Sequence, residues 1–124
     1  MNMLSTAPQA GAILWALLPE EGSARKAKER PVIVLDVSER DGFTYLTVAK
    51  GTSQKTDMLY RGEFAITDSL DIASCGLSEP TKFQLCRYET LLFTTDWFNT
   101  KLPRVLPQHL LRKLINAAQE AGHI

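Results

Sequence analysis

The chain has 124 residues, of which 44% are hydrophobic, and we expect one domain over residues 1–124 with its own core. Fourteen basic residues balance fourteen acidic residues, so the overall charge predicts binding neither to nucleic acid nor to a membrane surface. Electrostatic recognition must therefore come from charges that cluster locally.

The apolar run near the N-terminus could be mistaken for the core of a signal peptide. The preceding residues, MNMLSTAPQA, contain no Lys or Arg, and GAILWALLP is much shorter than a membrane span. We therefore expect a cytoplasmic protein that does not bind a membrane. Residues 12–18 are predicted to form a buried strand that Pro19 ends, and residues 1–9 a flexible tail.

The middle of the chain alternates polar turns with strands. The charged segment EEGSARKAKER, residues 20–30, predicts a flexible loop, and PVIVLDV predicts a strand that starts at Pro31, where no ladder N–H is needed. Asp41-Gly42 predicts a hairpin turn because both residues tolerate positive φ, and FTYLTVA predicts the returning strand. EFAIT is a further short strand.

The second half combines strands with two helices. DSLDIASCGL predicts one or two helical turns, with Asp68 as N-cap, Gly76 as C-cap and Leu77 folding back. TKFQLCRYETLLF predicts one or two strands. PQHLLRKLINAAQEAG, residues 107–122, predicts an amphipathic helix. Its expected apolar face consists of Leu110, Leu111, Leu114, Ile115 and Ala118.

These elements predict a mainly β (α+β) fold. We expect a strongly bent antiparallel sheet of five to seven strands over residues 11–98, forming a small barrel that the C-terminal helix closes.

The cysteines and histidines have no metal or redox spacing. Cys75 and Cys86 are too few for a disulfide scaffold, and we expect both to be reduced and buried. His109 and His123 lie on or just beyond the last predicted helix, and no acidic cluster has ligand spacing. The sequence therefore predicts no metal ion and no cofactor.

The first candidate for function is the basic cluster in RKAKER, residues 25–30. Its basic residues are Arg25, Lys26, Lys28 and Arg30. Such a cluster is either a solvated loop, which is the more common case, or a cationic mouth that holds phosphates. Arg30 adjoins the predicted strand, which holds its guanidinium in place. A fixed planar guanidinium is the group best suited to phosphate oxygens.

The second candidate is the polar step GTSQK, residues 51–55, which closes a predicted strand. It offers two hydroxyls, an amide and an ammonium, from Thr52, Ser53, Gln54 and Lys55. All of these groups can donate to a phosphate or a base. Taken alone, the step is more simply interpreted as a polar turn.

Together these segments resemble a known family. GAILW (residues 11–15), the charged loop, RPVIV (30–34) and TSQ (52–54) occur in the order and approximate spacing of the MazF/PemK-like toxins of bacterial type II toxin–antitoxin systems. The later segments resemble a longer branch of that superfamily. The resemblance implies an SH3-like barrel and metal-independent cleavage of single-stranded RNA, in which the 2′-hydroxyl attacks the adjacent phosphate.

The resemblance also implies roles for individual residues. Arg30 matches the catalytic arginine of the family and Thr52 its catalytic hydroxyl, while Ser53 and Gln54 orient the RNA. The remaining expected phosphate contacts are Arg25, Lys26, Lys28 and Lys55. The implied partners are a second copy of the chain and an antitoxin whose acidic, disordered segment covers RKAKER.

The chain also departs from the family pattern. Ala12 stands where the family often has an acidic residue, and KTDMLYRGEFAITDSLD aligns poorly with the region that selects the RNA sequence. A non-catalytic SH3-like binding module, or a prophage-encoded regulator that binds protein or nucleic acid, therefore remains the alternative.

Aromatic side chains raise a last question. They can stack on bases or, as is more common in a small protein, fill the core or a dimer interface. The candidates are Trp15, Tyr60, Phe93, Trp97 and Phe98.

Overall fold

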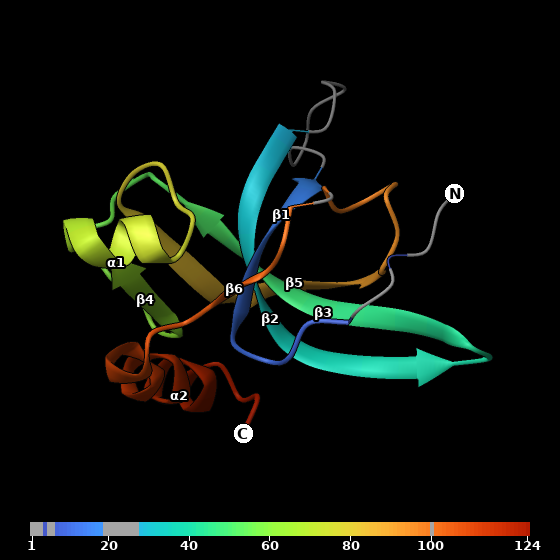
Figure 1. The fold of residues 1–124 in the computed structure, drawn as a ribbon. Coiled ribbons are helices and arrows are strands. Elements are labelled where there is room, and N and C mark those ends of the chain that lie inside the picture. The colour runs from blue at the N-terminus through green and yellow to red at the C-terminus, as the bar shows by residue number, and fades with distance from the viewer. Residues whose placement is uncertain (1–3, 5–6, 19–27, 100) are drawn as a thin grey trace.

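A computed structural model describes residue 4 and residues 7–18, 28–99 and 101–124 (Figure 1). Within these residues, six strands form one antiparallel sheet in the order β4-β5-β3-β2-β1-β6. The strands are β1 (Ala12–Leu18), β2 (Lys28–Arg40), β3 (Phe43–Thr52), β4 (Glu63–Ile66), β5 (Thr81–Leu92) and β6 (Arg104–Val105). The helices are α1 (Ser69–Ser74) and α2 (Leu111–Glu120), and a 3-10 turn, η1 (Gln108–Leu110), precedes α2.

The sheet curls into a half-barrel, which confirms the predicted mainly β, barrel-like fold (Figure 1). The outer edge of β1 is covered along most of its length. β6 pairs with its first two residues, Trp97 O accepts a hydrogen bond from Leu17 N at 2.6 Å, and Trp15 O accepts one from Asn99 N at 3.2 Å. Covering an edge in this way protects a sheet from pairing with other chains. The sequence did not predict β6, because two residues carry no periodicity.

Alternation along the strands divides the core between two faces of the sheet. On β1, Ile13 packs into a cluster with the helices, whereas Ala12, Leu14 and Ala16 pack into a second cluster. The first cluster comprises Ile13, Ile33, Ala49, Phe64, Ile66, Cys75, Leu77, Phe83, Leu85, Leu106, Leu110, Ala117 and Ala118. The second comprises Ala12, Leu14, Ala16, Leu18, Val32, Val34, Leu46, Val48, Leu91, Phe93 and Phe98.

The hairpin between β2 and β3 confirms the predicted turn. Asp41 and Gly42 have φ values of 53° and 82°, and Arg40 pairs with Phe43 on either side of them. Two successive residues with positive φ make a turn whose twist matches that of the strands.

The predicted start of the second strand was wrong. β2 begins at Lys28, so Pro31 lies inside the strand rather than at its start. Pro31 is opposite Trp15 of β1, but the pairing of β2 with β3 begins only at Val32. Pro31 is therefore tolerated because it precedes the stretch in which β2 is paired on both sides.

Helix α1 has the predicted N-cap and a slightly different C-terminus. The side chain of Asp68 accepts hydrogen bonds from two backbone N–H groups of the first turn. The C-cap is Cys75, and Gly76 follows it with a φ of 69°. Leu77 donates its backbone N–H to Ile72 O at 3.0 Å and is buried, as predicted.

The predicted C-terminal helix forms as η1 and α2, but its apolar face was partly wrong. Leu111 and Ile115 are 39% and 44% exposed, whereas Ala117 is buried. The packed side centres on Ala117 and Ala118 because small side chains let the helix approach the sheet closely. The predicted residues on the packed side are Leu110, Leu114 and Ala118. None of the helices in the described part of the chain has the length and apolar character that crossing a membrane requires.

The two cysteines occupy different environments. Cys75 is fully buried, and this burial raises the pKa of its thiol. Cys86 is exposed, so the expectation that both cysteines are buried was wrong. Cys86 lies where the pairing of β5 with β3 is interrupted by a bulge, which turns its side chain outward.

We expect a disulfide reagent such as DTNB to modify one thiol of the native chain at pH 8 and two after unfolding in guanidinium chloride. Cys86→Ser should abolish the reaction of the native protein because the Cys75 thiol is buried and keeps its proton more firmly. Cys75→Ala is the control and should leave the native reaction unchanged. Native labelling that disappears in Cys75→Ala would contradict the assignment.

Candidate functional site

The strand register brings the two candidate catalytic residues to the same level of the sheet. In the last pairs of β2 with β3, Val34 is opposite Val48 and Val32 is opposite Lys50. Continuing this register by two residues puts Arg30 opposite Thr52.

A close contact supports this continuation of the register. A Cβ atom on Gly51 would lie 2.8 Å from the carbonyl oxygen of Pro31 and 2.9 Å from the ring of Phe83. β2 and β3 are therefore still in contact one residue before the level of Arg30 and Thr52.

Arg30 and Thr52 share the face of the sheet that carries the second core cluster. Residues opposite each other project to the same side, and side chains alternate along a strand. Arg30 is opposite Ala16 and Lys28 is opposite Leu18, and both of these partners belong to the second cluster. Lys50 is opposite Val32 of the same cluster. This face therefore combines Arg30 and Thr52 with two lysines.

A hollow of about 250 Å³ opens on the same face. It is lined by Leu18, Val48, Lys50, Cys86, Arg87, Tyr88 and Glu89. The apolar residues Leu18 and Val48 belong to the second cluster, and the polar ones come from β3 and from the bulge in β5. The hollow thus has an apolar floor and a charged rim that includes Lys50 and Arg87. Such a lining suits a ligand with both a flat apolar part and a negative charge.

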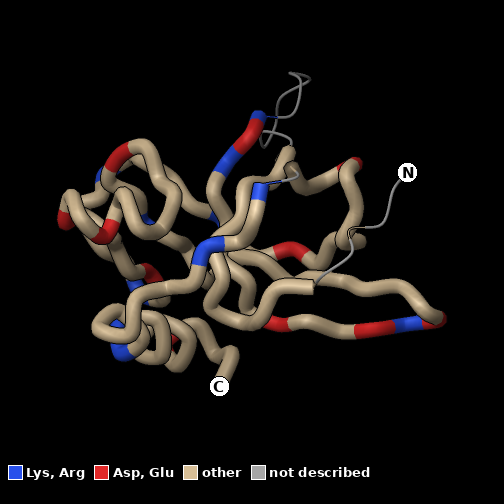
Figure 2. Tube along the Cα trace, in the orientation of Figure 1, with Lys and Arg blue, Asp and Glu red and all other residues tan. Residues whose placement is uncertain are grey.

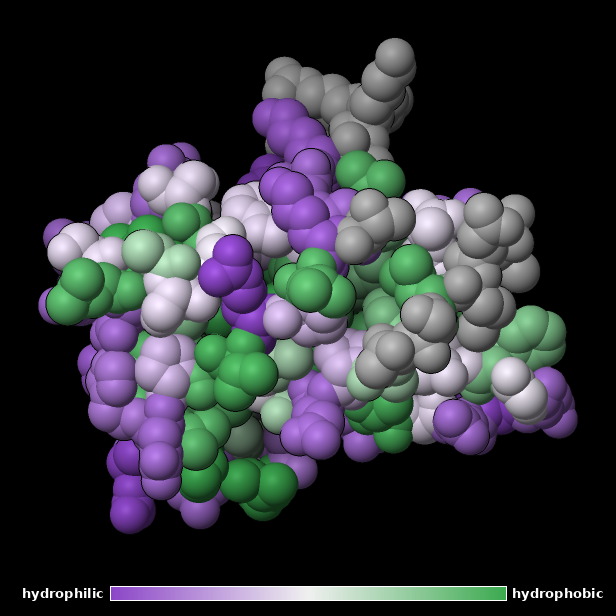
Figure 3. Space-filling view, in the orientation of Figure 1, coloured by the Kyte–Doolittle hydropathy of each residue, from purple (hydrophilic) through white to green (hydrophobic). Residues whose placement is uncertain are grey.

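Charge is concentrated where β2 begins. Lys28, Glu29 and Arg30 are the first three residues of β2. Figure 2 shows charged residues at this start of β2, and Figure 3 shows hydrophilic side chains there. Asn99 Nδ2 donates a hydrogen bond to Glu29 Oε1. Alternation puts Glu29 on the other side of the strand from its basic neighbours. The remaining basic candidates, Arg25 and Lys26, lie outside the described residues.

The polar step after Thr52 is a turn, as its simpler interpretation predicted. Gln54 N donates a hydrogen bond to Thr52 Oγ1 at 3.2 Å, and Lys55 has a φ of 52°. The hydroxyl of Thr52 accepts this bond and keeps its own proton to donate. Ser53, Gln54 and Lys55 are exposed. They are therefore close to Thr52 in the chain and accessible to a ligand.

A buried ion pair fixes the segment that follows this turn. Lys82 Nζ lies 2.8 Å from Glu63 Oε1, and the two side chains are only 3% and 8% exposed. Lys82 Nζ also donates to Met58 O at 2.9 Å, and Glu63 Oε1 accepts from Tyr60 N at 2.9 Å. Lys82 is opposite Thr52 in the sheet. The pair therefore attaches segment 53–62 to β5 beside Thr52.

The environment of Glu63 changes its proton affinity. Burial is the largest single influence and acts to raise its pKa, but hydrogen bonds from Lys82, Tyr60 N and Gln84, with the charge of Lys82, together lower the pKa. Gln84 Nε2 donates to Glu63 Oε2 at 3.0 Å. The carboxylate is thus held ionised by its partners despite its burial.

Several residues of this site were missed by sequence reasoning. Lys50 precedes Thr52 by two positions and could have been placed on its face from alternation alone. Arg87 gave no such signal, because a register shift of β5 beside Lys50 sets its position. The pairing of Glu63 with Lys82 depends on the β4–β5 register, which the separate strand patterns do not specify.

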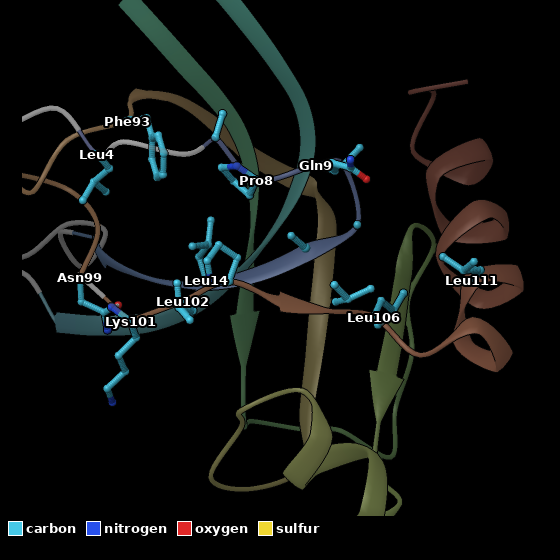
Figure 4. A pocket seen from close by; sticks show the side chains of 16 residues that line it. Leu4, Pro8, Gln9, Leu14, Phe93, Asn99, Lys101, Leu102, Leu106 and Leu111 are labelled. Atoms are coloured by element: carbon cyan, nitrogen blue, oxygen red, sulfur yellow. The ribbon is translucent and has the colours of Figure 1, made fainter.

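A second, larger hollow lies elsewhere. A groove of about 560 Å³ runs between the N-terminal segment, β1, Asn99 and residues 101–106 (Figure 4). Its labelled apolar lining includes Leu14, Phe93, Leu102, Leu106 and Leu111. Neither Arg30 nor Thr52 lines this groove or the smaller hollow. Its chemistry suits an apolar ligand or peptide rather than phosphate transfer.

The aromatic candidates separate clearly. Phe93 and Phe98 are buried against each other, with ring centroids 5.6 Å apart, and Trp15 Nε1 donates to Gly76 O at 3.1 Å. Trp97 is partly buried and packs against the second cluster. Tyr60 is 57% exposed. Of these five, Tyr60 is the one whose ring is accessible to a base.

No model of a known protein family matches this chain, and no curated protein matches it. The MazF/PemK-like resemblance therefore rests on the sequence pattern alone. In the part of the chain that the structure describes, no group of three or more His, Cys, Asp or Glu side chains could hold a metal ion.

We expect the Glu63–Lys82 pair to make stability fall at acidic pH. Because the pKa of Glu63 is lowered in the folded chain, the pair stabilises the protein above the ordinary value of 4.5, and this contribution is lost as the pH falls through the folded pKa. Glu63→Gln should therefore be less stable at pH 7 and should lose less stability between pH 6 and pH 3. Urea unfolding across this range measures the difference. Glu79→Gln, at an exposed position, is the control, and parallel curves for Glu63→Gln and wild type would contradict the expectation.

Proposed function

We propose that this protein is the toxin component of a type II toxin–antitoxin system and cleaves single-stranded RNA without a metal ion. The observation that carries the proposal is the β2–β3 register, which on continuation puts Arg30 opposite Thr52. The motif resemblance independently assigns catalytic roles to the same two residues. Lys50 and Arg87 at the adjacent hollow add positive charge for the flanking phosphates.

The proposed reaction is an intramolecular transesterification. The oxygen of the 2′-hydroxyl attacks phosphorus, and the bond from phosphorus to the 5′-oxygen breaks. The 2′-hydroxyl loses a proton and the leaving 5′-oxygen gains one, so there is no net change in protons. The products are a cyclic phosphate and a 5′-hydroxyl. The guanidinium of Arg30 stabilises the charge that develops on the phosphate oxygens, and the hydroxyl of Thr52 donates a second hydrogen bond. The family resemblance also assigns proton donation to Arg30.

Conservative substitutions at the two positions test the proposal. Arg30→Lys keeps the charge but loses the planar fork, and Thr52→Val keeps the shape but loses the hydroxyl. Each is expected to lower the cleavage rate about 100-fold to 1000-fold, the usual cost of one transition-state donor, and Arg30→Lys should retain part of the RNA binding. Purified protein is incubated with mixed single-stranded RNA in EDTA, and the product ends are mapped for cyclic phosphate.

Matched controls come from the other end of the same hairpin. Arg40→Lys and Thr44→Val make the same chemical changes beside the turn of β2 and β3 and should cut RNA at the wild-type rate. Induced expression of wild type should slow growth, and Arg30→Ala should not. The nuclease proposal is wrong if wild type neither cuts RNA nor slows growth, or if Arg30→Ala cuts normally.

The same proposal includes two partners. We propose a homodimer, and an antitoxin whose acidic, disordered segment lies across RKAKER and Arg30 and excludes the RNA. A glutamate-rich peptide should therefore compete with single-stranded RNA for the protein, measured by displacement of a labelled oligonucleotide. Simultaneous binding of peptide and RNA would contradict the competition, and sedimentation as a monomer at micromolar concentration would contradict the dimer.

The second candidate function is a binding module that does not cleave its ligand. The apolar groove of about 560 Å³ favours it, because the groove is larger than the hollow lined by Lys50 and Arg87 and its mostly apolar lining suits binding rather than phosphate transfer. The cleavage assay decides between the two, since a binding module leaves RNA intact.

A further inference from the structure

Tyr60 is an exposed aromatic residue whose ring is fixed in place. Its backbone N–H donates to Glu63 Oε1, and its hydroxyl donates to Met58 Sδ at 3.2 Å. Lys82 Nζ lies 5.0 Å from the centroid of its ring. The ammonium therefore occupies one face of the ring, and because Tyr60 is 57% exposed, the other face is accessible.

The position of this ring relates it to the candidate catalytic site. Lys82 is opposite Thr52 in the pairing of β5 with β3, so the two side chains share a face of the sheet. Tyr60 lies over Lys82 and is thus one strand away from Thr52.

The charges around the ring suit a nucleic acid. Segment 53–62 carries Lys55 and Arg61 against one acidic residue, Asp57. The charge of Lys82 is largely compensated by Glu63, and Arg61 Nε donates a hydrogen bond to Glu120 O of α2 at 3.0 Å. The exposed ammonium of Lys55 therefore supplies the main positive charge for phosphates beside the ring.

We propose that Tyr60 is a stacking platform for an unpaired base of single-stranded RNA, next to the phosphate that Arg30 and Thr52 hold. The inference rests on the proposed function for the position of that phosphate. An open aromatic face beside positive charge suits a ligand that has a flat π-surface and a linked negative charge, and a nucleobase with its phosphate has both. Tyr60 supplies the aromatic face, and the neighbouring basic residues supply the charge. Neighbouring Met58 and Leu59, which are 51% and 53% exposed, widen the apolar surface beside the ring.

The buried ion pair is then a positioning element for this platform. Lys82 and Glu63 hold the carbonyl of Met58 and the N–H of Tyr60 directly, so removal of either charge loosens residues 58–60, while Leu85 N still ties Gly62 O to β5 at 2.9 Å. A single replacement leaves the other charge buried without its partner, whereas replacement of both residues by methionine leaves no buried charge. Apolar replacement of a whole buried ion pair is often tolerated. The double variant should therefore fold, yet bind RNA as weakly as a Tyr60 variant.

The test measures binding separately from cleavage. The probe is a short 2′-O-methyl RNA that contains 2-aminopurine, which resists cleavage and whose fluorescence falls when the base stacks. Tyr60→Leu is expected to weaken binding about tenfold or more and to abolish the quenching, and Tyr60→Phe should preserve both. With cleavable RNA, Tyr60→Leu should raise KM with little change in kcat. Glu63→Met/Lys82→Met should resemble Tyr60→Leu.

A second tyrosine provides the matched control. Tyr45 also lies beside a cation, with Arg40 at 5.8 Å from its ring centroid, but at the far end of the β2–β3 hairpin. Tyr45→Leu should leave binding and quenching unchanged.

The outcomes separate this inference from the proposed function. If wild type cuts RNA and Tyr60→Leu binds and cuts as well as wild type, the stacking inference is wrong and the nuclease stands. If RNA is bound in a Tyr60-dependent way but never cut, the platform stands and the nuclease falls. If Tyr60→Leu instead turns a dimer into a monomer, the exposed ring belongs to a dimer interface and the inference is wrong. A protein that neither binds nor cuts RNA overturns both.

Discussion

The close approach of β2 and β3 at Gly51 is the constraint on which the candidate site depends. The carbonyl of Pro31 and the ring of Phe83 leave no room for a side chain at that position. Any other residue would push β3 away from β2 or from β5, because backbone atoms cannot move aside as a flexible side chain can. The register beyond this point decides whether Arg30 lies opposite Thr52, so a single glycine links the packing of the sheet to the geometry of the candidate site.

Local sequence patterns predicted the strands and helices of this fold well, but they could not predict the pairing register between strands that are distant in the sequence. The turn at Asp41-Gly42, the N-cap at Asp68 and the buried Leu77 depend on neighbours in the chain, and all three were predicted. The predicted apolar face of α2 was partly wrong because the residues that a helix buries depend on how closely it packs against the sheet. The prediction that Cys86 is buried was wrong because its exposure depends on a bulge in the pairing of β5 with β3, which the local sequence does not reveal.

The residues of the candidate site likewise fall into those that the sequence could identify and those that depend on strand register. Arg30 and Thr52 could be nominated from the resemblance, and alternation could have added Lys50. Arg87 and the Lys82–Glu63 pair could not be found, because they depend on which residues of β4 and β5 face each other. A sequence motif nominates candidate site residues more readily than the residues that hold them in position.

The burial of Lys82 and Glu63 is informative because it is costly. Removing two charges from water requires several kcal/mol per ion, and the attraction between them often does no more than offset this cost. An apolar pair at these positions would stabilise the sheet about as well. What an apolar pair cannot provide is the hydrogen bonds to Met58 O and Tyr60 N, which fix the backbone of a segment with few apolar contacts of its own. The ion pair is therefore better explained by the geometry that it imposes on segment 53–62 than by the free energy of folding, and that geometry holds the ring of Tyr60 over Lys82, the residue opposite Thr52.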